Sequence, residues 1–281
     1  MIVVTAATGH LGRLAVTALL DRGVPADRIV AAVRNPDKAA DLGVEVRLAD
    51  YTRPETLATA FAGAEKVLLI SSNAMGERLA QHRNAVDAAK AAGVGLLVYT
   101  SVLRADTTGL GLAVEHKATE EYITASGLPH VFLRNGWYLE NYTENLAPAL
   151  THGALLGSAE NGLVSAAARA DYAAAAAVVL TTDAPAKIYE LAGDRGFTMT
   201  ELAAEVSRQS GKEIAYRDLP QAEYFAALTG AGVPEQYADL LADSDVGVAK
   251  GDLHASDTVL SGLIGRPTTS LADAVSVALK N

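Results

Sequence analysis

Cysteine is absent from this 281-residue chain, which excludes disulfide bonds, thiolate nucleophiles and sulfur-bound metals. The absence fits the reducing cytoplasm, where disulfides are rare. Long apolar runs are also missing, because the longest, Ala173 to Leu180, is far too short to cross a bilayer. No basic stretch precedes an apolar segment near the first residue, so we expect no signal peptide. We therefore expect a cytoplasmic protein without a membrane-spanning segment.

Basic side chains are few. The 23 lysines and arginines face 33 aspartates and glutamates, which gives a formal net charge of −10. Nucleic-acid binding and adsorption to anionic membranes both need a basic face. We therefore expect neither a nucleic acid nor a membrane as a partner. The six histidines show no metal-ligand spacing, so no metal is expected.

The first half of the chain alternates short apolar runs with helical patterns. Continuous apolar strands are typical of a parallel sheet buried on both faces, and strand–helix alternation is typical of a doubly wound fold. We expect strands at 2–5, 28–33, 44–49, 66–70, 96–100 and 130–133, and helices at 10–21, 36–42, 54–61, 76–92 and about 112–126.

The segment that joins the first strand to the first helix is rich in glycine. Such a loop lets the backbone approach the pyrophosphate of a dinucleotide, while the helix N-terminus supplies amide donors. The alternative is a glycine turn that serves only strand–helix packing. Alanine stands where the first glycine of the pattern is usual, and it is strained if that position needs a positive φ. The cofactor-binding residues expected here are Ala6, Thr8, Gly9, His10, Leu11 and Gly12.

Arg34 closes the second strand, where the side chain selects the dinucleotide. A carboxylate there would hold the ribose 2′-hydroxyl of NAD, whereas a guanidinium matches the 2′-phosphate of NADP. We favour NADP, with Asn35 and Lys38 placed to assist. The alternative is a surface arginine at a strand end.

Polar residues also follow the third and fourth strands. Ligands of open α/β sheets bind beyond the carboxyl ends of the strands. We therefore expect Asp50 and Tyr51 at the edge of an adenine pocket. Ser71, Ser72 and Asn73 are expected beside the pyrophosphate and ribose. For each of them the alternative is simple helix capping.

The sixth strand ends in a segment that combines flat rings with amide groups. Asn135, Gly136, Trp137 and Tyr138 suit a slot for a nicotinamide ring and a flat partner. The alternative, an aromatic helix face in the core, accounts for Trp137 and accounts poorly for Asn135 and Gly136.

From about residue 150 the rhythm of the chain changes. We expect an NADP-binding domain at 1–150 and a smaller region at 151–281 that shapes a substrate cleft, with about 170–192 returning to the main sheet. The fold class is therefore α/β, a Rossmann-like doubly wound parallel sheet with a smaller C-terminal α/β cap. The elements expected in the second part are strands at 188–191 and 214–217 and helices at 200–209, 221–228, 235–241, 257–263 and 271–279.

Several segments resemble the NmrA-like atypical short-chain dehydrogenases, and within them the type 2 NADPH-dependent quinone oxidoreductases. The resemblance covers essentially the whole chain, with Ala6 as its one departure in the cofactor loop. The segments are Arg34-Asn35-Pro36, Leu69-Ile70-Ser71-Ser72, Tyr99-Thr100-Ser101, Leu133-Arg134-Asn135-Gly136-Trp137-Tyr138, Arg169-Ala170-Asp171-Tyr172 and Leu241-Ala242-Asp243-Ser244-Asp245.

The resemblance implies that NADPH gives a hydride directly to a quinone, without flavin or metal. Short-chain dehydrogenases commonly use a Tyr-x-x-x-Lys pair for proton transfer, and no tyrosine stands four residues before a lysine in the helix near Lys117. Reduction of a quinone to an aromatic hydroquinone needs little acid catalysis, which fits this absence. Tyr138 or His116 is the expected proton donor, although a lone helix histidine is more often structural.

Two other functions remain open. One is a non-catalytic NAD(P)-binding redox sensor, and the other is an NADP-dependent carbonyl or enone reductase. The protein is expected to be a monomer or a homodimer.

Overall fold

The computed structural model describes residues 1–280 of the chain. They form two compact units. The first unit comprises Met1–Ala105, Val114–Asn135 and Arg169–Leu191, and the second comprises Asp106–Ala113, Gly136–Ala168 and the chain from Ala192 onward. The main change of unit thus falls at residue 136, earlier than the expected 150, and residues 169–191 return to the first unit.

A wholly parallel, seven-stranded sheet forms the centre of the first unit, in the order β3-β2-β1-β4-β5-β6-β8. From β1 the chain winds outward to β3, and then returns to place β4 on the other side of β1. This reversal creates a switch point between β1 and β4, and it confirms the Rossmann-like doubly wound fold. The strands are β1 (Ile2–Thr5), β2 (Ile29–Val33), β3 (Glu45–Leu48), β4 (Lys66–Leu69), β5 (Leu96–Val102), β6 (His130–Asn135) and β8 (Ile188–Leu191).

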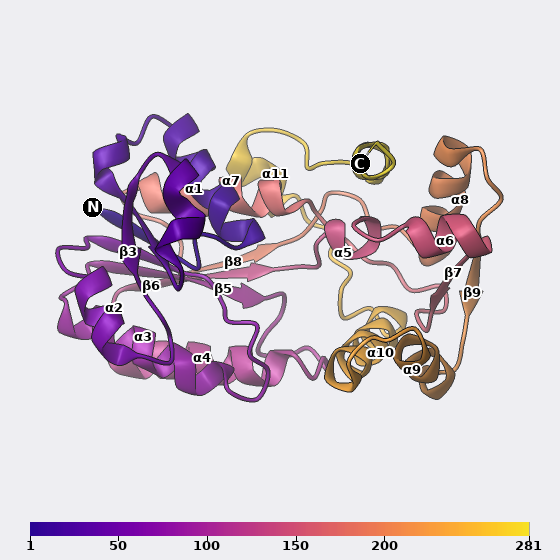
Figure 1. The fold of residues 1–281 in the computed structure, drawn as a ribbon, viewed down its shortest axis with the longest axis horizontal. Helices are drawn as coiled ribbons and strands as arrows, with labels where there is room; N and C mark the ends of the chain where they lie inside the picture. The colour runs from indigo at the N-terminus through magenta and orange to yellow at the C-terminus, as the bar shows by residue number, and fades with distance from the viewer. Residues whose placement is uncertain (281) are drawn as a thin grey trace. The chain divides into compact units, whose positions relative to one another are not determined.

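Helices cover both faces of this sheet (Figure 1). On one face α1 (His10–Asp21) packs against α7 (Arg169–Thr181). The other face carries α2 (Pro54–Ala60), α3 (Arg78–Ala91) and α4 (Ala113–Ser126). Two short 3₁₀ segments, η1 (Ala26–Arg28) and η2 (Pro36–Leu42), precede β2 and β3, and η2 stands where we expected an ordinary helix.

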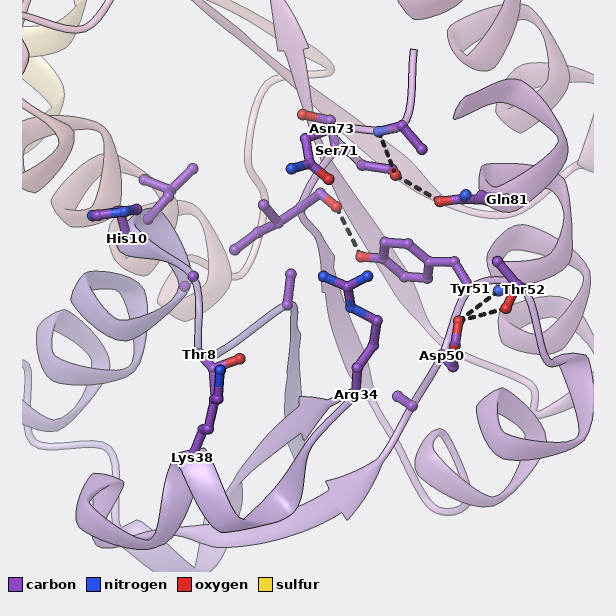
Figure 2. Close-up of a pocket in the computed structure, with 18 residues that line it drawn as sticks. Thr8, His10, Arg34, Lys38, Asp50, Tyr51, Thr52, Ser71, Asn73 and Gln81 are labelled. Atoms are coloured by element: carbon purple, nitrogen blue, oxygen red, sulfur yellow. Dashed lines mark hydrogen bonds between the residues drawn. The ribbon is translucent and has the colours of Figure 1, made fainter. Parts of the chain in front are cut away.

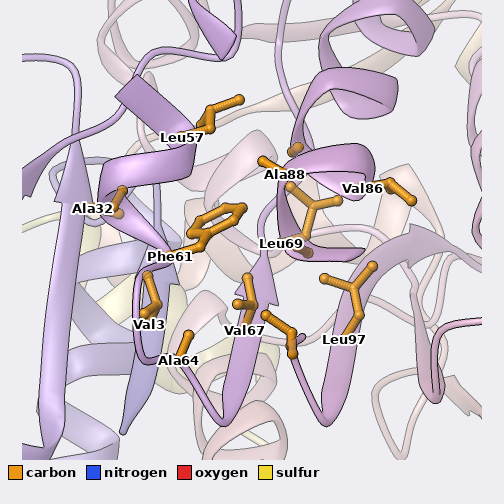
Figure 3. Packing of buried hydrophobic residues seen from close by; sticks show 14 of the residues in the cluster. Val3, Ala32, Leu57, Phe61, Ala64, Val67, Leu69, Val86, Ala88 and Leu97 are labelled. Atoms are coloured by element: carbon orange, nitrogen blue, oxygen red, sulfur yellow. The ribbon is translucent and has the colours of Figure 1, made fainter. Parts of the chain in front are cut away.

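The core on the α2 and α3 face is built around Phe61, which is fully buried (Figure 3). Leu57 of α2 and Val86 of α3 pack in the same cluster, together with Val67 and Leu69 of β4. All of these side chains are completely removed from solvent. Burial of apolar area on this scale is the main force that holds such a layer to its sheet.

The second unit contains a two-stranded parallel sheet, β7 (Ala154–Gly157) with β9 (Ala215–Asp218). β7 is not among the strands expected from the sequence, because glycines at residues 153 and 157 flank its two leucines and the apolar run is short. The helices of this unit are α5 (Glu140–Thr143), α6 (Ala147–His152), α8 (Met199–Ser210), α9 (Gln221–Gly230), α10 (Glu235–Ala249), α11 (Val259–Ile264) and α12 (Leu271–Ala278).

Helix α10 continues eight residues beyond the expected end at residue 241 (249 − 241). Its polar stretch stays helical because each polar group finds a partner. Ser244 donates to the Leu240 carbonyl oxygen at 2.6 Å, and Asp245 accepts from the Ser158 backbone N–H at 2.8 Å. Among residues 1–280, no helix is both long and apolar enough to span a bilayer.

Candidate functional site

A cavity of about 420 Å³ opens in the first unit beyond the carboxyl ends of β1, β2, β3 and β4 (Figure 2). It lies at the switch point of the sheet, where doubly wound folds bind their ligands. Its lining residues are Ala6, Thr8, Gly9, His10, Leu11, Gly12, Arg34, Lys38, Ala49, Asp50, Tyr51, Thr52, Ile70, Ser71, Ser72, Asn73, Ala74 and Gln81.

The glycine loop forms the floor of the cavity and turns on Ala6. This alanine has a φ of +48°, which is the left-handed conformation that strains a residue with a Cβ. The Gly9 N–H donates to the Ala6 carbonyl oxygen at 2.9 Å and closes the turn. A Cβ at Gly12 would lie 2.3 Å from that same oxygen and 2.7 Å from Ala7 Cα, so only glycine fits there.

Helix α1 presents an open N-terminus to the cavity. Its N-cap residue is Gly9, which provides no side chain to accept a bond from the first N–H groups. The first turn also carries no acidic side chain. Backbone donors and the positive end of the helix dipole are therefore available to an anion.

Arg34 is exposed, and its guanidinium points toward the centre of the cavity beside Tyr51 (Figure 2). No described residue forms a hydrogen bond or ion pair with it. In contrast, the guanidinium of Arg13 forms an ion pair with Asp41, in which Nη1 lies 2.8 Å from Oδ2. Arg34 therefore keeps its planar fork of donors for a ligand, and Lys38 lines the same wall.

Asp50, Tyr51 and Thr52 form the edge of the cavity after β3. Asp50 accepts from the Thr52 N–H at 2.9 Å and from the Thr52 hydroxyl at 2.8 Å. The backbone bond holds the pKa of Asp50 below its ordinary value, and the charge of Arg34 acts in the same direction. The Tyr51 hydroxyl donates to the Ile70 carbonyl oxygen at 2.8 Å, and its burial raises its pKa. Asp50 is therefore a fixed anionic acceptor at this edge.

The opposite wall is the segment after β4, in which Ser71, Ser72 and Asn73 all line the cavity. Asn73 is exposed, and none of residues 1–280 forms a hydrogen bond with its side chain. The sequence reasoning missed two polar lining residues, Thr52 and Gln81. Gln81 could have been found, because it is a polar residue on the buried face of α3 beside Ala85.

The expected nicotinamide residues divide between the two units. Asn135 ends β6 in the first unit, and its side-chain Oδ1 is buried without a partner among residues 1–280. Gly136, Trp137 and Tyr138 belong to the second unit and do not line the cavity. There the backbone of Trp137 accepts from the Ala167 N–H at 3.1 Å.

His116 lies inside the first unit, with 4% of its surface exposed. Its Nδ1 is 2.7 Å from the Tyr99 hydroxyl, and it does not line the cavity. Burial places its pKa well below the ordinary value, so the ring is neutral near pH 7. Among residues 1–280, no group of three or more histidine, aspartate and glutamate side chains could hold a metal ion.

Comparison with known proteins places the chain among nicotinamide-cofactor enzymes of similar sequence and fold. Residues 1–257 match the NmrA-like family. The chain is 51% identical over 280 residues to quinone oxidoreductase 2 of Escherichia coli K12, with 98% of each chain covered. The crystal structure of an E. coli NADPH-dependent quinone oxidoreductase complexed with NADPH matches all of both chains, with a TM-score of 0.97 and 51% identity. The structure of Citrobacter sp. triphenylmethane reductase with NADP(H) covers 99% of this chain and 100% of that chain, with a TM-score of 0.94 and 38% identity.

The glycine loop, the doubly wound sheet and the family match over most of the chain lead to one assignment. The protein belongs to the NmrA-like family.

Proposed function

We propose that this protein is an NADPH-dependent quinone reductase. The observation that carries the proposal is the unpaired Arg34 guanidinium in a cavity at the switch point of the sheet. The acceptor class is supported by the full-length similarity to the E. coli quinone oxidoreductase.

The residues of the cavity fit NADPH. The open N-terminus of α1 offers donors to a pyrophosphate, and the missing side chain of Gly12 lets this helix begin close against the Ala6–Ala7 backbone. Arg34 would bind the 2′-phosphate as a bidentate partner, with Lys38 adding charge. Asp50 would accept from an amino group of the adenine, since it lacks a proton of its own to donate.

When bound, NADPH supplies a hydride, and a quinone that takes up this hydride and one proton becomes an aromatic hydroquinone. The chain must hold two flat rings face to face and exclude water. Asn135 offers a buried acceptor oxygen at the end of β6 that would orient an amide. Of the two expected proton donors we propose Tyr138, because His116 is buried against Tyr99 whereas Tyr138 is only half-buried. We propose that neither flavin nor metal takes part.

The test is a turnover assay with purified protein, NADPH or NADH, and a panel of benzoquinones and naphthoquinones, with no flavin added. We expect rapid loss of absorbance at the reduced nicotinamide band with NADPH, and much slower loss with NADH. Enone and carbonyl acceptors in the same assay serve as the matched comparison. Turnover only with those acceptors would replace the quinone assignment. Tight NADPH binding without any turnover would support a redox sensor instead.

A further inference from the structure

The segment from Ile70 to Ala74 lines the cavity and joins β4 to the turn before α3. It belongs to no helix or strand, so no regular pattern of backbone hydrogen bonds satisfies its N–H groups. Its backbone N–H groups must therefore find other partners, because a buried donor without one is costly.

Side chains supply these partners one after another. The Ile70 N–H donates to Thr5 Oγ1 at 2.9 Å, and the Ser71 N–H donates to Thr100 Oγ1 at 2.9 Å. The Ser72 N–H donates to Nε2 of His82, also at 2.9 Å. His82 is the only one of these three acceptors whose side chain is an imidazole, and the other two are threonine hydroxyls.

Helix α3 holds Ser72 at two further atoms. Arg78 Nε donates to the Ser72 carbonyl oxygen at 2.7 Å, and the Ser72 hydroxyl donates to Gln81 Oε1 at 2.6 Å. Arg78, Gln81 and His82 are spaced i, i+3 and i+4, which places them on one face of the helix. All three side chains on that face are buried, and each forms a hydrogen bond with Ser72 of the cavity wall.

The hydrogen bonds also determine which nitrogen of His82 carries the proton. Nδ1 lies 3.0 Å from Thr119 Oγ1, whose own proton goes to the Glu115 carbonyl oxygen at 2.8 Å. Thr119 must therefore accept from His82 Nδ1–H, which leaves Nε2 free to accept from Ser72. Burial lowers the pKa of His82 to about 3, with the charge of Arg78 adding to the effect, so the ring is neutral.

The ring itself has little room to turn. His82 is fully buried, and it packs edge-on against Tyr51 at a centroid distance of 6.1 Å and against Tyr99 at 5.3 Å. Tyr51 is itself a wall residue of the cavity. The imidazole is thus enclosed between the cavity wall and the core.

We infer that His82 is a positioning residue for the cofactor site. Its neutral Nδ1–H imidazole fixes the Ser72 amide and thereby holds Ser71 and Asn73 in the cavity wall with their side chains available to the ligand. The inference rests on the proposed function for the identity of the ligand, which is NADPH. It adds a specific function for a side chain that does not line the cavity.

Substitutions at His82 separate the hydrogen bond from simple packing. His82→Leu fills the core and removes the acceptor, whereas His82→Gln keeps an acceptor oxygen near the Nε2 position. Val86→Ala is the matched control, because Val86 is fully buried on the same helix and makes none of the hydrogen bonds to Ser72. Should His82→Leu fail to fold, Thr119→Val is a milder variant that keeps the imidazole and removes the Nδ1 partner together with the Thr119 bond to the Glu115 carbonyl oxygen.

The first measurement is hydrogen exchange of the amides of residues 70–75 in the protein without cofactor. We expect at least tenfold faster exchange in His82→Leu, a smaller increase in Thr119→Val, and no change in His82→Gln or Val86→Ala. The second is the dissociation constant of NADPH measured by fluorescence. We expect it to rise about tenfold in His82→Leu and to stay within about threefold of the wild type in His82→Gln.

In turnover, the Michaelis constant for NADPH should follow the dissociation constant, while kcat at saturating NADPH changes far less. The inference is overturned if His82→Leu binds NADPH like the wild type and loses only thermal stability, as Val86→Ala does. It is also overturned if folded His82→Gln is as impaired as His82→Leu, because the acceptor is then irrelevant. Failure of the wild type to bind NADPH would contradict the proposed function, whereas the exchange rates would still decide whether His82 holds the segment.

Discussion

At the residue scale, we propose that Arg34 selects NADPH over NADH. Arg34→Ala removes a bidentate charged donor that no described residue uses. We expect the Michaelis constant for NADPH to rise roughly 10- to 100-fold, as for the loss of about 1.5–3 kcal/mol of charged hydrogen bonding. The value for NADH should change little, because NADH lacks the 2′-phosphate. Steady-state kinetics with both cofactors measure this, and Arg34→Lys, which keeps the charge without the fork, should lie between. Equal effects on both cofactors would remove Arg34 from the 2′-phosphate.

Ala6 carries backbone strain at the cofactor loop, since its φ is +48°. A left-handed alanine costs roughly 1–2 kcal/mol of folding free energy. Glycine removes this strain, but it also gives the unfolded chain more conformational entropy, which offsets part of the gain. We expect Ala6→Gly to leave the stability unchanged or to raise it by up to about 1 kcal/mol. NADPH binding should stay the same or tighten. Denaturant unfolding and fluorescence titration provide the two values, and clearly weaker binding would show that the Ala6 methyl contacts the cofactor.

At the element scale, Arg134 ties three elements of the first unit together. Its guanidinium on β6 lies 2.6 Å from Glu120 Oε2 on α4 and 2.8 Å from Glu190 Oε1 on β8. Arg134 and Glu120 are both nearly buried, with 7% and 8% of their side chains exposed. Removal of one partner leaves a charge that water cannot reach.

Glu120→Ala should therefore destabilise the protein by roughly 3 kcal/mol or more, and Glu120→Gln by less, since its amide oxygen still accepts. Unfolding in urea measures both variants. Arg28→Ala is the control, because it breaks an exposed ion pair with Glu65 on the same unit and should change stability much less. A Glu120→Ala effect as small as that of the control would mean that the buried network does not hold α4 to the sheet.

At the scale of the whole molecule, NADPH binding should raise the melting temperature, because a ligand of the folded state alone stabilises it. At 100 times its dissociation constant, the gain is about 2.7 kcal/mol, or several degrees for a chain of this length. NADH at the same concentration should give a distinctly smaller shift. A thermal melt with each cofactor measures the difference between the two shifts in melting temperature. In Arg34→Ala this difference should disappear. Equal shifts for NADPH and NADH in the wild type would contradict the selectivity assigned to Arg34.

The sequence predicted the parallel sheet well, because buried strands such as Ile29–Val33 are uninterrupted apolar runs whose pattern is local. It failed at Ala154–Gly157, where a strand of four residues pairs only with a segment about 60 residues further along. The residues of the cavity wall also divide into those with a local sequence signal and those placed only by long-range contacts. Arg34 and Ser71 could be predicted because each lies within two residues of a strand end. His82 could not, because its bond to Ser72 depends on how α3 packs against the sheet.

The sequence by itself determined the doubly wound fold and the residues at the strand ends that line the cavity, since both follow from short-range patterns of apolar residues, glycines and charges. Only the tertiary structure decided the left-handed conformation of Ala6, the division of residues 135–138 between two units and the buried position of His116. It also decided that a buried histidine of α3 accepts from the Ser72 amide in the cavity wall. These features depend on contacts between residues far apart in the chain, which no local pattern records.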